Sequence, residues 1–116
     1  MLNPIKLASK NFLSSLDTSL EEFLHILELA KNFKNKDLNI KLKEKVLGLI
    51  FDKSSTRTRV SFQVAMSRLG GTTVDLNPTT SQIGRGEPIR DTARVLSRYC
   101  DVLAIRTFKQ TDLEEY

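Results

Sequence analysis

Three apolar runs recur along the chain, and segments with helical spacing separate them. The run at 46–51 predicts a buried strand, and the segments 72–76 and 101–106 predict two more. Helical spacing over about 57–69, and again from Pro88 onward, predicts the connecting helices. Because such alternation favours right-handed βαβ units, the sequence predicts an α/β fold, a three-layer αβα arrangement around a central parallel sheet.

A further amphipathic pattern precedes the first strand. Residues 20–34 carry apolar side chains at helical spacing, and two overlapping capping boxes, Thr18 with Glu21 and Ser19 with Glu22, can begin this helix. In the helix after Pro88, the spacing predicts a buried stripe made of Ile89, Ala93, Leu96 and Tyr99.

The end of the chain has an incomplete helical pattern. Thr111 and Glu114 form a capping box, yet the sequence stops two residues later. A capped helix with no body cannot bury an apolar face. We therefore expect residues 1–116 to be a single, truncated domain of a longer protein.

Composition and charge narrow the class of protein. The chain has no apolar stretch near the roughly 20 residues that span a bilayer and no apolar signal core, so we expect no membrane partner and a cytoplasmic location. The single cysteine, Cys100, excludes an internal disulfide and a cysteine-based zinc site. With no nucleic-acid motif or aromatic stacking series, the net charge of +4 does not predict a nucleic-acid partner.

The turn between the first predicted strand and the next helix carries the candidate chemistry. Residues 54–59 (Ser-Ser-Thr-Arg-Thr-Arg) place hydroxyls and guanidiniums where a helix begins. A helix N-terminus already offers free N–H groups and a partial positive charge, so these side chains complete a site for a phosphate-like dianion. Every arginine lies between Arg57 and Arg106, whereas residues 1–50 use only lysine, and the planar guanidinium suits phosphate.

Two further segments, 77–87 and 106–108, also follow predicted strands. In a parallel sheet the carboxyl ends of the strands share one edge, where ligands bind. The convergence predicts a small, doubly charged, phosphate-bearing ligand. The side chains that the topology brings to this rim are Arg57, Arg59, Gln82, Arg85 and Arg106.

Some of these arginines also have structural interpretations. Arg59 could face the ligand or pair with an acid such as Asp52 or Glu87, and Arg85 is better explained as structural or solvated. Three more arginines share one helix face at i, i+4 spacing, which indicates a solvated surface: Arg90, Arg94 and Arg98.

The motifs resemble a known family. The string Ser-Thr-Arg-Thr-Arg at 55–59, with Ser-Phe at 61–62 and Leu-Gly-Gly at 69–71, is similar to the aspartate/ornithine carbamoyltransferase family. The resemblance covers nearly the whole chain. It implies the N-terminal, carbamoyl-phosphate-binding part of a two-domain transcarbamoylase, without the second domain that binds ornithine.

Three segments resemble the ornithine branch of the family in particular: 51–54, 81–87 and 91–98. The aspartate branch typically has a lysine where this chain has Gln82. The implied reaction converts carbamoyl phosphate and L-ornithine to L-citrulline and phosphate, a step of arginine biosynthesis or of urea-cycle type. It needs no cofactor and no metal ion.

The resemblance also implies roles for individual residues. Arg57 would bridge toward the leaving oxygen, while Thr58 and Arg106 would stabilise the carbamoyl oxyanion, which makes these three catalytic. The residues implied to bind carbamoyl phosphate are Ser55, Thr56, Arg57, Thr58, Arg59, Arg106 and, reaching into the adjacent subunit of a homotrimer, Gln82.

Two alternatives remain open. Another transcarbamoylase, acting on aspartate, putrescine or an acylated ornithine, would share this half-site. The chain could instead be a non-catalytic phosphate-binding or trimerisation fragment, because the His-Pro-x-Gln motif of the family is missing from it. We therefore expect no useful turnover from these 116 residues alone.

Overall fold

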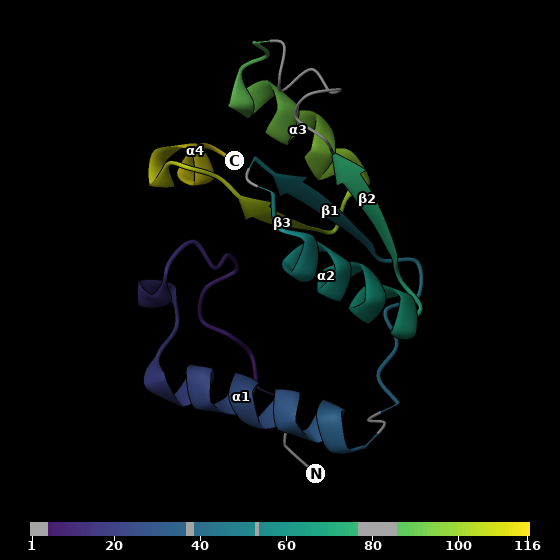
Figure 1. Ribbon diagram of the computed structural model, residues 1–116. Coiled ribbons are helices and arrows are strands. Elements are labelled where there is room, and N and C mark those ends of the chain that lie inside the picture. Colours follow the sequence, from purple (N-terminus) through teal and green to yellow (C-terminus); the bar gives the residue numbers. More distant parts are fainter. Residues whose placement is uncertain (1–4, 37–38, 53, 77–85) are drawn as a thin grey trace. The chain divides into compact units, whose positions relative to one another are not determined.

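The computed structural model describes residues 5–36, 39–52, 54–76 and 86–116 (Figure 1). The chain divides into two compact units, Met1–Ile40 and Lys41–Tyr116. In chain order, the elements are η1 (Ser15–Asp17) and α1 (Leu20–Asn35) in the first unit, and β1 (Val46–Phe51), α2 (Thr56–Arg68), β2 (Thr72–Leu76), α3 (Ile89–Tyr99), β3 (Val102–Arg106) and α4 (Gln110–Glu115) in the second.

Helix α1 begins at a complete capping box. The Ser19 hydroxyl accepts from the Glu22 N–H at 3.1 Å, and the Glu22 carboxylate accepts from the Ser19 N–H at 3.0 Å and the Ala8 N–H at 2.8 Å. Of the two predicted boxes, the structure therefore uses Ser19 rather than Thr18. The bonds from Ser19 and then Ala8 lower the pKa of Glu22, so their stabilisation is present above the unfolded pKa and is lost as pH falls through the folded one.

The three strands of the second unit form one parallel sheet in the order β2-β1-β3. Helix α2 connects β1 to β2, and α3 then carries the chain back across β1 to β3. Because two right-handed crossovers that run in opposite directions lie on opposite faces, α2 and α3 cover the two sides of the sheet, as Figure 1 shows. The predicted α/β fold with a central parallel sheet is confirmed.

Strand β1 is the centre of the core. Leu49 and Ile50 are fully buried, and Met66 of α2 joins Leu47 and Leu49 in one apolar cluster. The edge strands are less covered, and Val102 at the start of β3 is 61% exposed. A central strand that is covered on both faces reads as a continuous apolar run, which is why the sequence identifies β1 so clearly.

Helix α2 ends at a Schellman motif, in agreement with the predicted stop at the two glycines. The Gly71 N–H donates to the Met66 carbonyl at 2.9 Å, and the Gly70 N–H donates to the Ser67 carbonyl at 3.2 Å. Gly70 has a φ of 85°, a left-handed conformation that glycine adopts without steric cost. The turn leads directly into β2.

Helix α3 follows its predicted buried stripe except at Tyr99. Ala93 is buried and Ile89 and Leu96 are half-buried, but Tyr99 is 75% exposed, and Thr92, which was not predicted, is buried. Thr92 can occupy the covered face because its hydroxyl donates a 2.6 Å hydrogen bond to the Glu87 carboxylate, which satisfies a polar group that would otherwise be costly to bury.

Replacing Thr92 by valine should lower the free energy of unfolding by about 1–3 kcal/mol. The two side chains have similar shapes, but valine leaves the partly buried Glu87 carboxylate without its hydroxyl donor. Denaturant unfolding followed by circular dichroism measures the change. Ser97→Ala is the control, because its exposed hydroxyl bonds to the Arg94 carbonyl of the same helix. Equal losses from both variants would contradict the role given to Glu87.

Helix α4 begins differently from its prediction. It starts at Gln110, its N-cap residue makes no side-chain capping bond, and Thr111 is already helical, so the predicted capping box of Thr111 with Glu114 is wrong. At the end of α4, burial raises the pKa of Tyr116 to about 12. The Asp52 carboxylate adds to this effect, and the acids of α4 contribute less.

Within the described residues, no helix has the length and apolar character to cross a membrane.

Candidate functional site

The candidate site lies at the carboxyl edge of the sheet, where β1 and β3 end side by side. Phe51, the last residue of β1, is in register with Arg106, the last residue of β3. Beyond that pair, the Asp52 N–H donates to the Arg106 carbonyl at 2.8 Å. This extension of the ladder holds Arg106 beside the turn that leaves β1, as the topology predicts.

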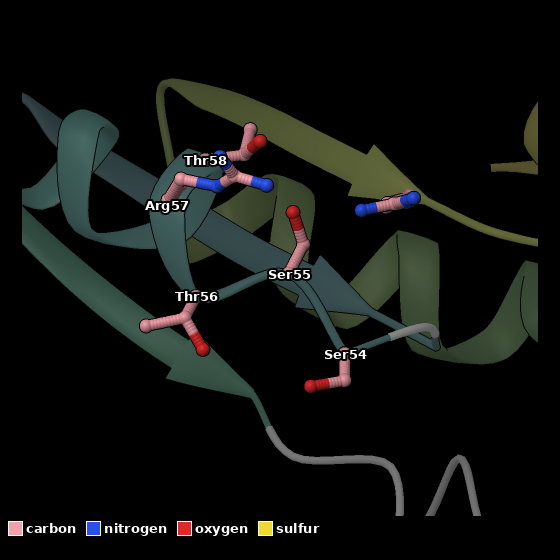
Figure 2. Close-up of a pocket in the computed structure, with 6 residues that line it drawn as sticks. Ser54, Ser55, Thr56, Arg57 and Thr58 are labelled. Atoms are coloured by element: carbon pink, nitrogen blue, oxygen red, sulfur yellow. The ribbon is translucent and has the colours of Figure 1, made fainter.

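A cleft of about 630 Å³ opens at this edge (Figure 2). Its volume falls within the range of roughly 300–1,000 Å³ that is common for small-ligand sites. The residues that line it carry hydroxyls or guanidiniums, with no carboxylate among them. They are Ser54, Ser55, Thr56, Arg57, Thr58 and Arg106.

The first turn of α2 carries N–H and hydroxyl donors that have no partner within the helix. Ser55 is the N-cap residue, but its hydroxyl makes no capping bond, and the first intrahelical bond runs from the Arg59 N–H to the Ser55 carbonyl at 3.0 Å. The N–H groups of Thr56, Arg57 and Thr58 therefore have no acceptor within the helix. Figure 2 shows the Ser55 hydroxyl on the same side of the turn as the Arg57 guanidinium, with the Thr56 hydroxyl directed away.

Two positive charges add to these donors. Arg57 and Arg106 are both exposed, and within the described part of the chain neither forms an ion pair. Both guanidiniums line the cleft, together with the partial positive charge of the helix N-terminus. The arrangement is suited to hold an anion with several oxygen atoms.

Arg59 has a different environment from Arg57. It is half-buried, it does not line the cleft, and its guanidinium lies 3.6 Å from the Asp75 carboxylate of β2. The structural alternative for Arg59, an ion pair, is thus found, although the partner is Asp75 rather than Asp52 or Glu87. Direct contact of Arg59 with phosphate stays a prediction.

Other residues of this edge were not given individual roles or lie outside the described residues. Ser54 lines the cleft, as expected of the segment 54–59, although it was not among the residues implied to bind carbamoyl phosphate. Thr107, next to Arg106, has a buried hydroxyl with no hydrogen-bond partner among the described residues.

Two predicted rim residues, Gln82 and Arg85, lie outside the described residues. Among the residues that the structure describes, no group of three or more His, Cys, Asp or Glu side chains could hold a metal ion.

Comparison with known proteins assigns the residues of this site to a protein family. Residues 10–116 match the model of the aspartate/ornithine carbamoyltransferase, carbamoyl-P binding domain. The chain belongs to this carbamoyltransferase family. The match includes every residue that lines the cleft, and it confirms the resemblance drawn from the motifs.

Individual carbamoyltransferases agree with this assignment. The chain is 78% identical over 116 residues to ornithine carbamoyltransferase from Prochlorococcus marinus subsp. pastoris, but it spans only 38% of that protein. Ornithine carbamoyltransferase from Pyrococcus furiosus superposes with a TM-score of 0.85 at 46% identity, over 97% of this chain and 37% of that one.

A more distant carbamoyltransferase shows the same fold. Aspartate transcarbamoylase from Trypanosoma cruzi, solved in complex with carbamoyl phosphate and aspartate, is 32% identical with a TM-score of 0.80, over 94% of this chain and 37% of that one. The higher identities to ornithine carbamoyltransferases favour the ornithine branch, as the motifs do. In each comparison this chain corresponds to little more than a third of the relative.

Proposed function

We propose that this chain is the carbamoyl-phosphate-binding part of an ornithine carbamoyltransferase. The observation that carries the proposal is the start of α2, where unused N–H and hydroxyl donors meet two guanidiniums without carboxylate partners among the described residues. A phosphate dianion needs such a combination of charge and directed donors. The identities to ornithine carbamoyltransferases support ornithine as the acceptor.

In the proposed reaction, the side-chain amine of L-ornithine attacks the carbamoyl carbon of carbamoyl phosphate. A C–N bond forms, the carbonyl becomes a tetrahedral oxyanion, the C–O bond to phosphate breaks, and the amine loses a proton to give L-citrulline and phosphate. Positioning and charge stabilisation supply the catalysis, with no covalent nucleophile from the protein.

Five of the six cleft residues have a proposed role in that reaction. Ser55 and the N–H groups of the first turn hold the phosphate oxygens, with Thr56 contributing mainly through its backbone. Arg57 binds the phosphate and the leaving oxygen, and neutralises the charge that develops there. Thr58 and Arg106 lie on the carbamoyl side, where they stabilise the oxyanion.

The remaining parts of the proposed enzyme lie beyond the described site. We infer that Gln82 completes the phosphate site of an adjacent subunit in a homotrimer, and that a second domain brings L-ornithine. The proposed setting is arginine biosynthesis in the cytoplasm. The domain match over residues 10–116 supports treating the chain as the carbamoyl-phosphate half of such an enzyme.

Isothermal titration of the 116-residue chain tests the proposal. Carbamoyl phosphate should bind, inorganic phosphate should compete with it, and the affinity should fall as salt rises because the site is built on charge. L-Ornithine should give no heat of binding in the absence of carbamoyl phosphate, since the proposed ornithine-binding groups lie elsewhere. Absence of carbamoyl phosphate binding, or equal affinity for chloride, would reject the assignment.

A further inference from the structure

The Arg59–Asp75 ion pair joins the first turn of α2 to the neighbouring strand β2. The Arg59 guanidinium lies 3.6 Å from the Asp75 carboxylate, and the Arg59 N–H closes the first turn by donating to the Ser55 carbonyl at 3.0 Å. One residue therefore both completes the turn that carries the cleft residues and reaches across to the sheet.

The rest of α2 provides little other anchorage at this end. Within the described residues, the one buried residue of the helix is Met66, in its last turn. Near the cleft, Val60 is 46% exposed and Phe62 is 39% exposed. Apolar packing thus anchors the end of α2 that is far from the cleft, and the ion pair anchors the near end.

The same pair gives the second arginine of the motif an acidic partner. Arg59 is half-buried beside a carboxylate, whereas Arg57 and Arg106 line the cleft. Without Asp75, a third guanidinium would lie on the same turn with no acid opposite it. The two arginines of the motif thus differ: Arg57 lines the cleft, and Arg59 pairs with Asp75 of β2.

We propose that Arg59 and Asp75 are positioning residues for the anion site, and that Arg59 acts through the first turn of α2 rather than by touching phosphate. This inference rests on the proposed function, because it concerns the same cleft. It replaces the predicted phosphate contact of Arg59 with an indirect role. It also gives Asp75, which no motif singled out, a part in ligand binding.

The decisive variant is the double substitution Arg59→Gln/Asp75→Asn in the 116-residue chain. It keeps the net charge of the wild type and removes only the ion pair. Because the variant removes one partly exposed ion pair, we expect inorganic phosphate to bind roughly twofold to fivefold more weakly, with an unchanged dependence of affinity on salt. Arg59→Lys should recover most of the affinity, because lysine can still pair with Asp75.

Two results would overturn the proposal. Wild-type affinity in the double variant would show that the pair positions nothing. A loss in Arg59→Gln as large as that in Arg57→Gln, with no recovery in Arg59→Lys, would make Arg59 a direct ligand.

Amide hydrogen exchange provides a second measurement that needs no ligand. The backbone N–H at position 59 donates to the Ser55 carbonyl, so it should exchange faster in the double variant than in the wild type, while amides in the last turn of α2 keep their protection. Unchanged exchange at position 59 would reject the anchoring role. If the wild type failed to bind phosphate, the proposed function would fail, and exchange would still decide whether the pair holds the turn.

Discussion

Truncating Leu49 to alanine should lower the free energy of unfolding by about 2–5 kcal/mol. Leu49 is fully buried at the middle of the central strand, between β2 and β3 and beside Met66. Its removal forfeits the transfer free energy of the side chain and leaves a cavity that the surrounding strands can only partly fill. A small domain has roughly 5–15 kcal/mol of stability in total, so this loss is a large share of it.

Urea unfolding followed by circular dichroism measures the effect, with the transition midpoint as the readout. Leu20→Ala is a matched control, because it makes the same chemical change at a residue that is 73% exposed, and it should shift stability by less than about 0.5 kcal/mol. Leu49→Met, which conserves volume, should lose less than about 1.5 kcal/mol and remain folded. Similar losses at Leu49 and Leu20 would mean that β1 is not the core of the second unit.

The sequence predicts the fold well because the strongest signals are local. The apolar run of β1 has the predicted bounds, Val46–Phe51, and α2 begins and ends within one residue of its prediction. A continuous apolar run and a pair of glycines at the end of a helix each specify their own structure. The order β2-β1-β3 was not predicted, because the right-handed crossover rule fixes the hand of each connection and allows more than one strand order.

The errors concern residues whose environment depends on tertiary partners. Tyr99 has the helical spacing of a buried residue, yet it is 75% exposed at the last position of α3, whereas Thr92, which the pattern did not select, is buried and bonds to Glu87. Thr111 has the sequence of a capping residue, but α4 begins before it. Helical spacing shows which residues share a face, but it does not show how far the neighbouring elements cover that face.

The candidate site shows the same division. The turn, the helix N-terminus and Arg106 come together as predicted, because strand ends in a parallel sheet share an edge. The partner of Arg59 could not be deduced, because several acids lie within reach of a long side chain and only the register of β2 brings Asp75 close. The role of Gln82 stays a prediction.

Replacing Arg57 by glutamine should weaken carbamoyl phosphate binding by roughly tenfold to a hundredfold. A hydrogen bond to a charged group contributes about 1.5–3 kcal/mol, and each 1.4 kcal/mol changes affinity tenfold. Arg57 is exposed, lines the cleft and has no acid partner among the described residues, so its guanidinium is available to the ligand. Arg57→Lys keeps the charge but loses the planar, two-donor geometry, and should fall between the wild type and Arg57→Gln.

Arg68→Gln is the matched control for this measurement. Arg68 is an exposed arginine in the last turn of the same helix, away from the cleft residues, and its replacement changes the net charge by the same amount. Any general effect of net charge on anion binding should therefore appear in both variants, and the difference between them isolates the contact made by Arg57. Undiminished binding in Arg57→Gln, or an equal loss in Arg68→Gln, would show that Arg57 is not part of the site.

The same guanidinium is proposed to neutralise the leaving phosphate. In any longer form of the protein that turns over, Arg57→Gln should therefore lower kcat as well as affinity, whereas the loss of a simple binding contact would lower affinity alone.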